Sequence, residues 1–153
     1  MATTVDTRSP THVSVNRLAK YGLLTVFVAV VANTLVRMIT LSVSTVPVGF
    51  WPLGWGAVLG STVLTTGGAT IVYGGITRYS KRPNRMFTIV AMVVLLLSFG
   101  SFVAPPSVLA AAPTSVLAAL AMMHVIVAVV SVGVLTRAAD NAETPKSTKN
   151  TPT

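Results

Sequence analysis

The chain has 153 residues, of which 52% are hydrophobic and 9% charged, with a net charge of +8 and no cysteine. A soluble domain has roughly a quarter of its residues charged, so a soluble fold of this length would leave too much apolar surface in water. The composition therefore excludes an ordinary soluble domain and predicts a single membrane domain. The lack of cysteine excludes disulfides, thiolate nucleophiles and cysteine-ligated metals.

Two segments, residues 1–18 and 138–153, are rich in threonine, serine, asparagine and proline and are predicted to be disordered tails. Between them, residues 19–137 hold four apolar runs, each near the length of about 20 residues that a membrane-spanning helix needs. The predicted spans cover residues 20–43, 53–77, 86–103 and 114–136. No proline lies inside these runs, as expected for helix interiors. We therefore predict an all-α integral membrane protein, an up-down-up-down four-helix bundle.

The basic residues predict the orientation of these spans. All except Arg37 lie before or at the first residue of the first span, between the second and third, or after the fourth, whereas connections 44–52 and 104–113 carry no charge. The positive-inside rule places the basic side and both termini in the cytoplasm of a cell membrane. The basic clusters thus indicate a lipid bilayer as partner and no nucleic acid. A cleaved signal peptide within residues 1–33 is disfavoured, because the apolar run is long and no small-residue cleavage site ends it.

The second span holds seven of the eleven glycines. Small residues recur there at heptad spacing in two adjacent rows, Gly60, Gly67 and Gly74 beside Ser61, Gly68 and Gly75. Helices in lipid associate through close contact at small residues, because lipid gives no hydrophobic drive. This helix-packing seam predicts either the interior of the bundle or a contact in a homo-oligomer.

Three residues at membrane depth, Asn33, Arg37 and His124, are costly to bury in lipid and are therefore functional candidates. At about 1.5 Å of rise per residue, Asn33 and His124 come to nearly the same depth, with Thr65 and Thr66 of the second span. Arg37 lies one turn further outward on the same helical face as Asn33. We predict an intramembrane polar cluster of Asn33, Arg37, Thr65 or Thr66, and His124.

Each member of this cluster has alternative interpretations. Arg37 could extend its guanidinium to the outer headgroups, act as a hydrogen-bond hub or bind an anion. Asn33 is typical of an interhelical hydrogen bond. His124 could be a neutral packing residue, a proton relay or a ligand. It shares one small and polar helical face with Ala128 and Ser131.

The residues needed for catalysis are missing from the spans. The three acids, Asp6, Asp140 and Glu143, all lie in the predicted tails. The spans therefore offer no carboxylate for proton or sodium transport, no acidic pair for acid–base chemistry and no histidine cluster for a metal. A serine or threonine nucleophile would have only His124 as base and no acid to orient it. We expect no enzyme, no cofactor and no metal.

The connection between the second and third spans is strongly basic, with Arg78, Lys81, Arg82 and Arg85. Such a segment binds anionic lipid headgroups at about 1 kcal/mol per charge. The positive-inside pattern by itself also accounts for these residues.

From this connection onward the chain resembles a family of uncharacterised four-span membrane proteins of bacteria and archaea. The resemblance rests on Arg82-Pro83 leading to Phe87, on residues 95–98 followed by Pro105-Pro106, and on Met123-His124 with Thr136-Arg137. Asn33 and Arg37 also fit it, and it covers roughly residues 18–137. It implies a prokaryotic cytoplasmic membrane and no known activity, so no catalytic residue is carried over.

The leading functional hypothesis is a non-enzymatic membrane protein that acts through helix association, with itself or with a membrane partner. The alternative is a small channel or transporter for an anion or small solute that uses the polar cluster around Arg37 and His124. That alternative predicts a water-accessible cavity reaching Arg37 from outside. A third hypothesis, an intramembrane enzyme, would need a cofactor or partner that supplies the missing acid.

Overall fold

The computed structural model describes residues 13–103, 106–110 and 112–143, and every regular element in these ranges is a helix. The elements are α1 (Val15–Val43), the 3-10 helix η1 (Trp51–Leu53), α2 (Trp55–Tyr79), α3 (Pro83–Val103), α4 (Ser107–Ala110) and α5 (Thr114–Glu143). The tails predicted to be disordered fall largely on residues 1–12 and 144–153, which lie outside the described residues.

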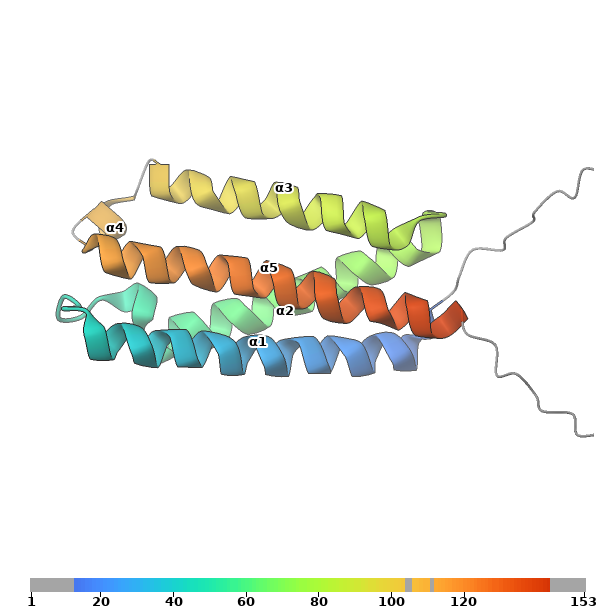
Figure 1. The fold of residues 1–153 in the computed structure, drawn as a ribbon, viewed down its shortest axis with the longest axis horizontal. Coiled ribbons are helices and arrows are strands. Elements are labelled where there is room, and N and C mark those ends of the chain that lie inside the picture. Colours follow the sequence, from blue (N-terminus) through green and yellow to red (C-terminus); the bar gives the residue numbers. More distant parts are fainter. Residues whose placement is uncertain (1–12, 104–105, 111, 144–153) are drawn as a thin grey trace, which may run out of the picture.

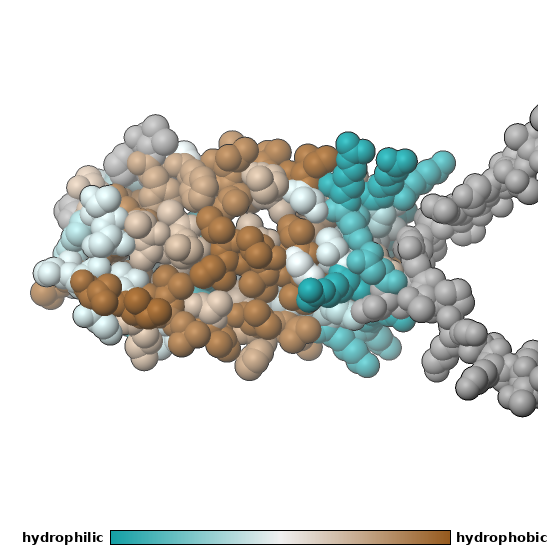
Figure 2. Space-filling view, viewed as in Figure 1, coloured by the Kyte–Doolittle hydropathy of each residue, from teal (hydrophilic) through white to brown (hydrophobic). Residues whose placement is uncertain are grey.

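Four helices, α1, α2, α3 and α5, are long and apolar enough to cross a membrane. The mean hydropathy of their most apolar stretches ranges from 1.2 in α2 to 2.4 in α5. Large apolar side chains face outward; Leu64 of α2 is 78% exposed and Leu97 of α3 is 73% exposed. Figure 2 shows these apolar surfaces as a belt that ends abruptly at a hydrophilic end of the molecule. This surface suits a multi-pass membrane protein, whose surrounding solvent is lipid.

The four long helices lie side by side (Figure 1). The α2–α3 turn lies at the same end as the start of α1 and the end of α5, and we call this the basic end. The α1–α2 and α3–α5 connections lie at the opposite end. Helix α1 packs mainly against α5 and α2, whereas α3 packs mainly on α5 and more sparsely on α2.

Two helices extend further than the predicted spans, into the predicted tails. Helix α1 begins at Val15, because Ser14 caps it by accepting a hydrogen bond from the Arg17 N–H to its Oγ at 3.4 Å. Helix α5 continues to Glu143, and its Ala138 and Ala139 are 0% and 4% exposed. Residues 15–18 and 138–143, which the sequence placed in disordered tails, are therefore helical; the cap stabilises the start of α1, and burial of Ala138 and Ala139 stabilises the last part of α5.

The basic end is held by an apolar core and by one asparagine. Tyr73 of α2 and Phe87 of α3 meet edge to face with ring centroids 5.0 Å apart. The Tyr73 hydroxyl donates to Asn84 Oδ1 at 2.7 Å, and Asn84 Nδ2 donates to Asp140 Oδ1 at 2.9 Å and to the Thr136 carbonyl at 3.4 Å. We call these contacts the Asn84 junction. They join α2, α3 and α5, so Asp140 takes part in the fold rather than in a free tail.

The predicted glycine seam is only partly an interior contact. A Cβ on Gly74 would lie 2.6 Å from Leu18 Cδ2 of α1. A Cβ would meet no atom within 4 Å at the four other glycine positions, Gly60, Gly67, Gly68 and Gly75. No neighbouring helix approaches α2 closely at these four positions.

The buried face of α2 carries threonines instead. Thr62, Thr66 and Thr77 are buried, and each hydroxyl donates to a carbonyl three or four residues earlier in its own helix. Because the helix itself accepts these protons, the threonines can be buried without an unpaired hydroxyl hydrogen. This local satisfaction lets the threonine face, rather than most of the glycine seam, enter the bundle.

Candidate ligand cavity

A cavity of about 340 Å³ lies between α2, α3 and α5, with Asn33 of α1 in its wall. Its volume is within the range of about 300–1,000 Å³ that is typical of small-molecule pockets. Small residues from three helices leave this space open, namely Gly68 and Ala69 of α2, Ala91 of α3 and Ala128 of α5. The sparse contact between α2 and α3 adds to it.

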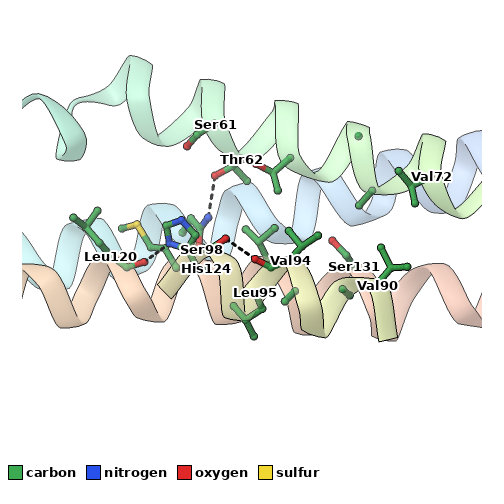
Figure 3. A pocket seen from close by; sticks show the side chains of 18 of the residues that line it. Ser61, Thr62, Val72, Val90, Val94, Leu95, Ser98, Leu120, His124 and Ser131 are labelled. Carbon is green, nitrogen blue, oxygen red and sulfur yellow. Dashed lines mark hydrogen bonds between the residues drawn. The ribbon is translucent and has the colours of Figure 1, made fainter. Parts of the chain in front are cut away.

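The cavity wall is mostly apolar, and its polar groups gather toward one end. Figure 3 shows Ser61, Thr62, Ser98 and His124 close to that end, and Ser131 further along α5, near Val72 and Val90. Valines and leucines of all three helices line the remaining wall. Apart from His124, no residue in the described lining has an ionisable side chain.

Asn33 contributes a hydrogen-bond acceptor that has no partner. Asn33 is only 3% exposed, and its Nδ2 donates to Thr62 Oγ1 at 2.9 Å. Thr62 has already donated its own proton to the Val58 carbonyl at 2.6 Å. The Asn33 amide must therefore turn its NH₂ toward Thr62, since an oxygen there would meet no proton. Asn33 Oδ1 is consequently left buried without a hydrogen bond.

His124 adds a second acceptor. Its Nδ1 lies 2.8 Å from the Leu120 carbonyl one turn earlier in α5. A carbonyl only accepts, so Nδ1 carries the proton, and in the neutral ring Nε2 presents a lone pair. The ring also meets Phe102 of α3 edge to face, with centroids 5.9 Å apart and an interplanar angle of 88°. These two contacts set the orientation of the imidazole at the cavity wall.

The serines of the cavity fall into two kinds. Ser98 donates to the Val94 carbonyl at 2.9 Å, and Ser61 donates to the Val58 carbonyl at 3.4 Å, so their oxygens keep only acceptor capacity for a ligand. Ser131 is 3% exposed and its Oγ has no hydrogen-bond partner. In Figure 3 its hydroxyl points from α5 into the space toward α2.

The structure divides the predicted polar cluster. Asn33, Thr65 and His124 all line the cavity. Thr66 is fully buried and donates to the Thr62 carbonyl at 2.7 Å, so it belongs to the interior of the bundle. Arg37 is not among the lining residues.

Arg37 instead ties α1 to the beginning of α2. Its Nε donates to the Leu53 carbonyl at 2.8 Å, and its guanidinium carbon lies 4.0 Å from the centroid of the Trp55 ring. Of the three interpretations of Arg37, these contacts match the hydrogen-bond hub, with an added cation–π contact.

Replacing Arg37 by methionine keeps an apolar stem but removes the donor and the charge. We expect Arg37→Met to lower the free energy of unfolding by about 1–2 kcal/mol, because a part-buried carbonyl and an indole face lose their partner. Denaturation in bicelles with added dodecyl sulfate, followed by circular dichroism, measures this change. Arg85→Met, at an exposed position of the basic end, is the matched control. Equal stability of the two variants would contradict an anchoring role for Arg37.

Several cavity residues are absent from the predicted cluster, chiefly Thr62, Ser98 and Ser131. Ser131 follows His124 by seven residues, which is about two helical turns and places both on one face of α5. That signal is present in the sequence. Ser131 lies about 10 Å from His124 along the helix axis, so a cluster defined by a common depth does not include it.

The comparisons with known proteins assign no activity. Residues 13–141 match the model of a family described as a family of unknown function (DUF6069). No curated protein and no solved structure matches the chain. The family match covers all four long helices except the last two residues of α5, and it includes every cavity residue named above. It agrees with the resemblance to an uncharacterised family.

Proposed function

This chain belongs to a family of unknown function, and from its cavity we propose that it is a non-enzymatic membrane protein that binds a small, lipid-soluble molecule between its helices. The observation that carries the proposal is the cavity of about 340 Å³ with the buried, unpartnered Asn33 Oδ1 in its wall. A buried polar atom without a partner costs about 1–3 kcal/mol, and a bound ligand would offset this cost.

We place the four long helices across a prokaryotic cell membrane as an up-down-up-down bundle with the basic end in the cytoplasm. The positive-inside rule supports this orientation, because the exposed Arg78, Lys81, Arg82 and Arg85 lie at that end. The same residues are suited to anionic lipid headgroups. At the opposite end Trp51 is 70% exposed and Trp55 is 47% exposed, as suits side chains at a membrane interface.

A lipid-soluble ligand would reach the cavity sideways from the bilayer. Helix α3 packs mainly on α5, and its sparse contact with α2 makes the gap between α2 and α3 the natural route. The valines and leucines that line this gap match an apolar molecule. An anion is a poor match, because Arg37 lies outside the cavity lining and is engaged with Leu53 and Trp55, and no lysine or arginine lines the described wall.

Filling the cavity tests this proposal. Gly68 lines the cavity and a Cβ there would meet no atom within 4 Å, so Gly68→Leu adds bulk without a clash at its first atom. We expect native mass spectra of protein released from nanodiscs to show a bound small molecule in the wild type and at least about tenfold less in Gly68→Leu. A leucine in the cavity removes the ligand's volume, whereas retention of other bound lipids should stay unchanged.

Gly60→Leu is the matched control, because Gly60 also faces open space but does not line the cavity. It should retain the bound molecule at the wild-type level. A wild-type protein that is released without any bound small molecule, or an equal amount in Gly68→Leu, would refute the proposal.

Helix association remains a second candidate, and the open glycine positions favour it. Gly60 and Gly67 lie outside the cavity and face open space, so a helix of another copy or of a membrane partner can approach α2 closely there. The same two variants separate the two functions. If association is the function, Gly60→Leu should abolish a defined oligomer in the native mass spectrum while ligand retention is unaffected.

A further inference from the structure

We propose that the molecule bound in this cavity is a neutral hydroxyl compound, whose one O–H proton is donated to an acceptor at the polar end, Asn33 Oδ1 or His124 Nε2, and whose apolar body lies along α5. This inference rests on the proposed function, since it names the class of ligand for the same cavity. It follows from which protons are already used, which charges are absent and how the polar groups are spaced.

The polar end of the cavity presents more acceptors than donors. The Thr62, Ser61 and Ser98 hydroxyls each donate to a backbone carbonyl of their own helix. Asn33 gives an N–H to Thr62, and the proton on His124 Nδ1 faces the Leu120 carbonyl. What remains unpaired in the wall at this end is mainly acceptors, a carbonyl-type oxygen, an imidazole lone pair and hydroxyl lone pairs, beside two donors, the second N–H of Asn33 and the hydroxyl of Thr65. A ligand that only accepts, such as a ketone, an ester or an ether, would leave Asn33 Oδ1 as unpaired as before.

The lack of acidic and basic side chains other than His124 in the described wall further restricts which donor group the ligand can carry. A protonated amine is a strong donor, but no carboxylate lines the described wall, and an unpaired cation at this depth is very costly. A carboxylic acid that ionised there would likewise meet no basic side chain other than His124. A hydroxyl group donates its proton without carrying charge, so an alcohol or phenol satisfies Asn33 Oδ1 at the lowest desolvation cost.

The spacing of the polar groups shapes the rest of the ligand. Ser131 lies seven residues beyond His124 on α5, which corresponds to about 10 Å along the helix axis. Between them the wall is formed by apolar side chains, including Val127, Ala128 and Val94. The ligand is therefore elongated, with its hydroxyl at the Asn33 end and an apolar body reaching toward Ser131. The free Ser131 hydroxyl offers one further contact for a polar group at the far end.

The test compares two probes that differ in whether the oxygen carries a proton, para-octylphenol and its methyl ether, in nanodiscs containing the full-length protein. The readout is the nitrogen-15 resonance of His124 Nε2, which moves when this atom accepts a hydrogen bond. The chain has two histidines, and a His12→Gln variant assigns the remaining signal to His124. Methyl resonances of Val94 and Val127 report occupancy of the cavity independently of hydrogen bonding.

We expect the phenol to shift the Nε2 resonance saturably and to bind roughly tenfold more tightly than the ether, as the loss of one hydrogen bond predicts. His124→Phe keeps an aromatic ring and should reduce this preference by severalfold, with methyl shifts as the readout. Asn33→Leu should remove most of the remainder. Met122→Phe, at a position 54% exposed and outside the cavity lining, is the control and should leave both affinities unchanged.

The outcomes distinguish this inference from the function on which it rests. If both probes shift the Val94 and Val127 methyl resonances with equal affinity, the cavity binds small molecules and the hydroxyl preference is refuted. If neither probe perturbs any residue of the cavity, both the inference and the proposed function fail. The comparison of the two probes in the wild type tests the hydroxyl preference even if a variant does not fold.

Discussion

Gly22→Leu should destabilise the protein more than any other single change that we consider, by at least about 3 kcal/mol, the upper part of the range for overpacked interiors. A Cβ on Gly22 would lie 2.6 Å from Thr70 Cγ2 and 3.1 Å from Thr70 Oγ1. Thr70 cannot turn away at low cost, because its hydroxyl donates to the Thr66 carbonyl at 2.9 Å and its χ1 is restricted in a helix. Helices α1 and α2 would therefore have to separate.

The measurement is the free energy of unfolding in bicelles, with Gly60→Leu as the control for the same chemical change in open space. Gly60→Leu should change stability by less than about 1 kcal/mol, because it adds no clash. The smaller substitution Gly22→Ala should also lower the free energy of unfolding. Combining it with Thr70→Ala should restore much of that stability, because the second change removes Thr70 Cγ2 and Oγ1, the two atoms nearest to the added Cβ. A Gly22→Leu protein as stable as Gly60→Leu would contradict the close approach of α1 and α2.

Asn84→Leu should be the next most damaging change, with an expected loss of about 2–4 kcal/mol in the free energy of unfolding. Two groups lose their hydrogen-bond partner, and each unpaired group costs about 1–3 kcal/mol. The buried Tyr73 would keep a hydroxyl without an acceptor, and Asp140 would lose the N–H that joins it to α3. Equilibrium unfolding, with fluorescence or circular dichroism as the signal, measures the loss.

A double-mutant cycle shows whether the Asn84 junction acts as one unit. Tyr73→Phe removes the hydroxyl and keeps the ring that contacts Phe87. If Asn84 and Tyr73 act together, the double variant should be less destabilised than the sum of the single variants, because the phenylalanine that replaces Tyr73 has no hydroxyl left to satisfy. Strict additivity would contradict this coupling.

The Asn84 junction also bears on access to the cavity. It fixes α3 to α2 and α5 at the basic end. Along the rest of its length α3 packs mainly on α5 and has only sparse contact with α2. Movement of α3 about its fixed end would widen the gap between α2 and α3 without breaking the core at Tyr73 and Phe87. A weaker junction is therefore expected to change the rate of ligand exchange as well as stability.

The sequence by itself determined the number, approximate bounds and helical nature of the long segments. Apolar runs near the length of a membrane span, free of proline, fold as helices because every backbone group must be satisfied within the segment. It also placed Asn33, Thr65 and His124 at a common depth, because the rise per residue is fixed, and the structure brings them to one cavity. Helix length and depth are local properties of the chain.

Only the tertiary structure decided which face of each helix turns inward. In α2 the glycine seam and the threonine row both repeat with helical spacing, and the threonines enter the bundle because their own helix accepts their protons. The tertiary structure also decided which groups the Arg37 side chain contacts, because the Leu53 carbonyl and the Trp55 ring are distant from it in sequence. Rotation about a helix axis and the reach of a side chain depend on neighbouring helices, and periodicity within one helix does not contain that information.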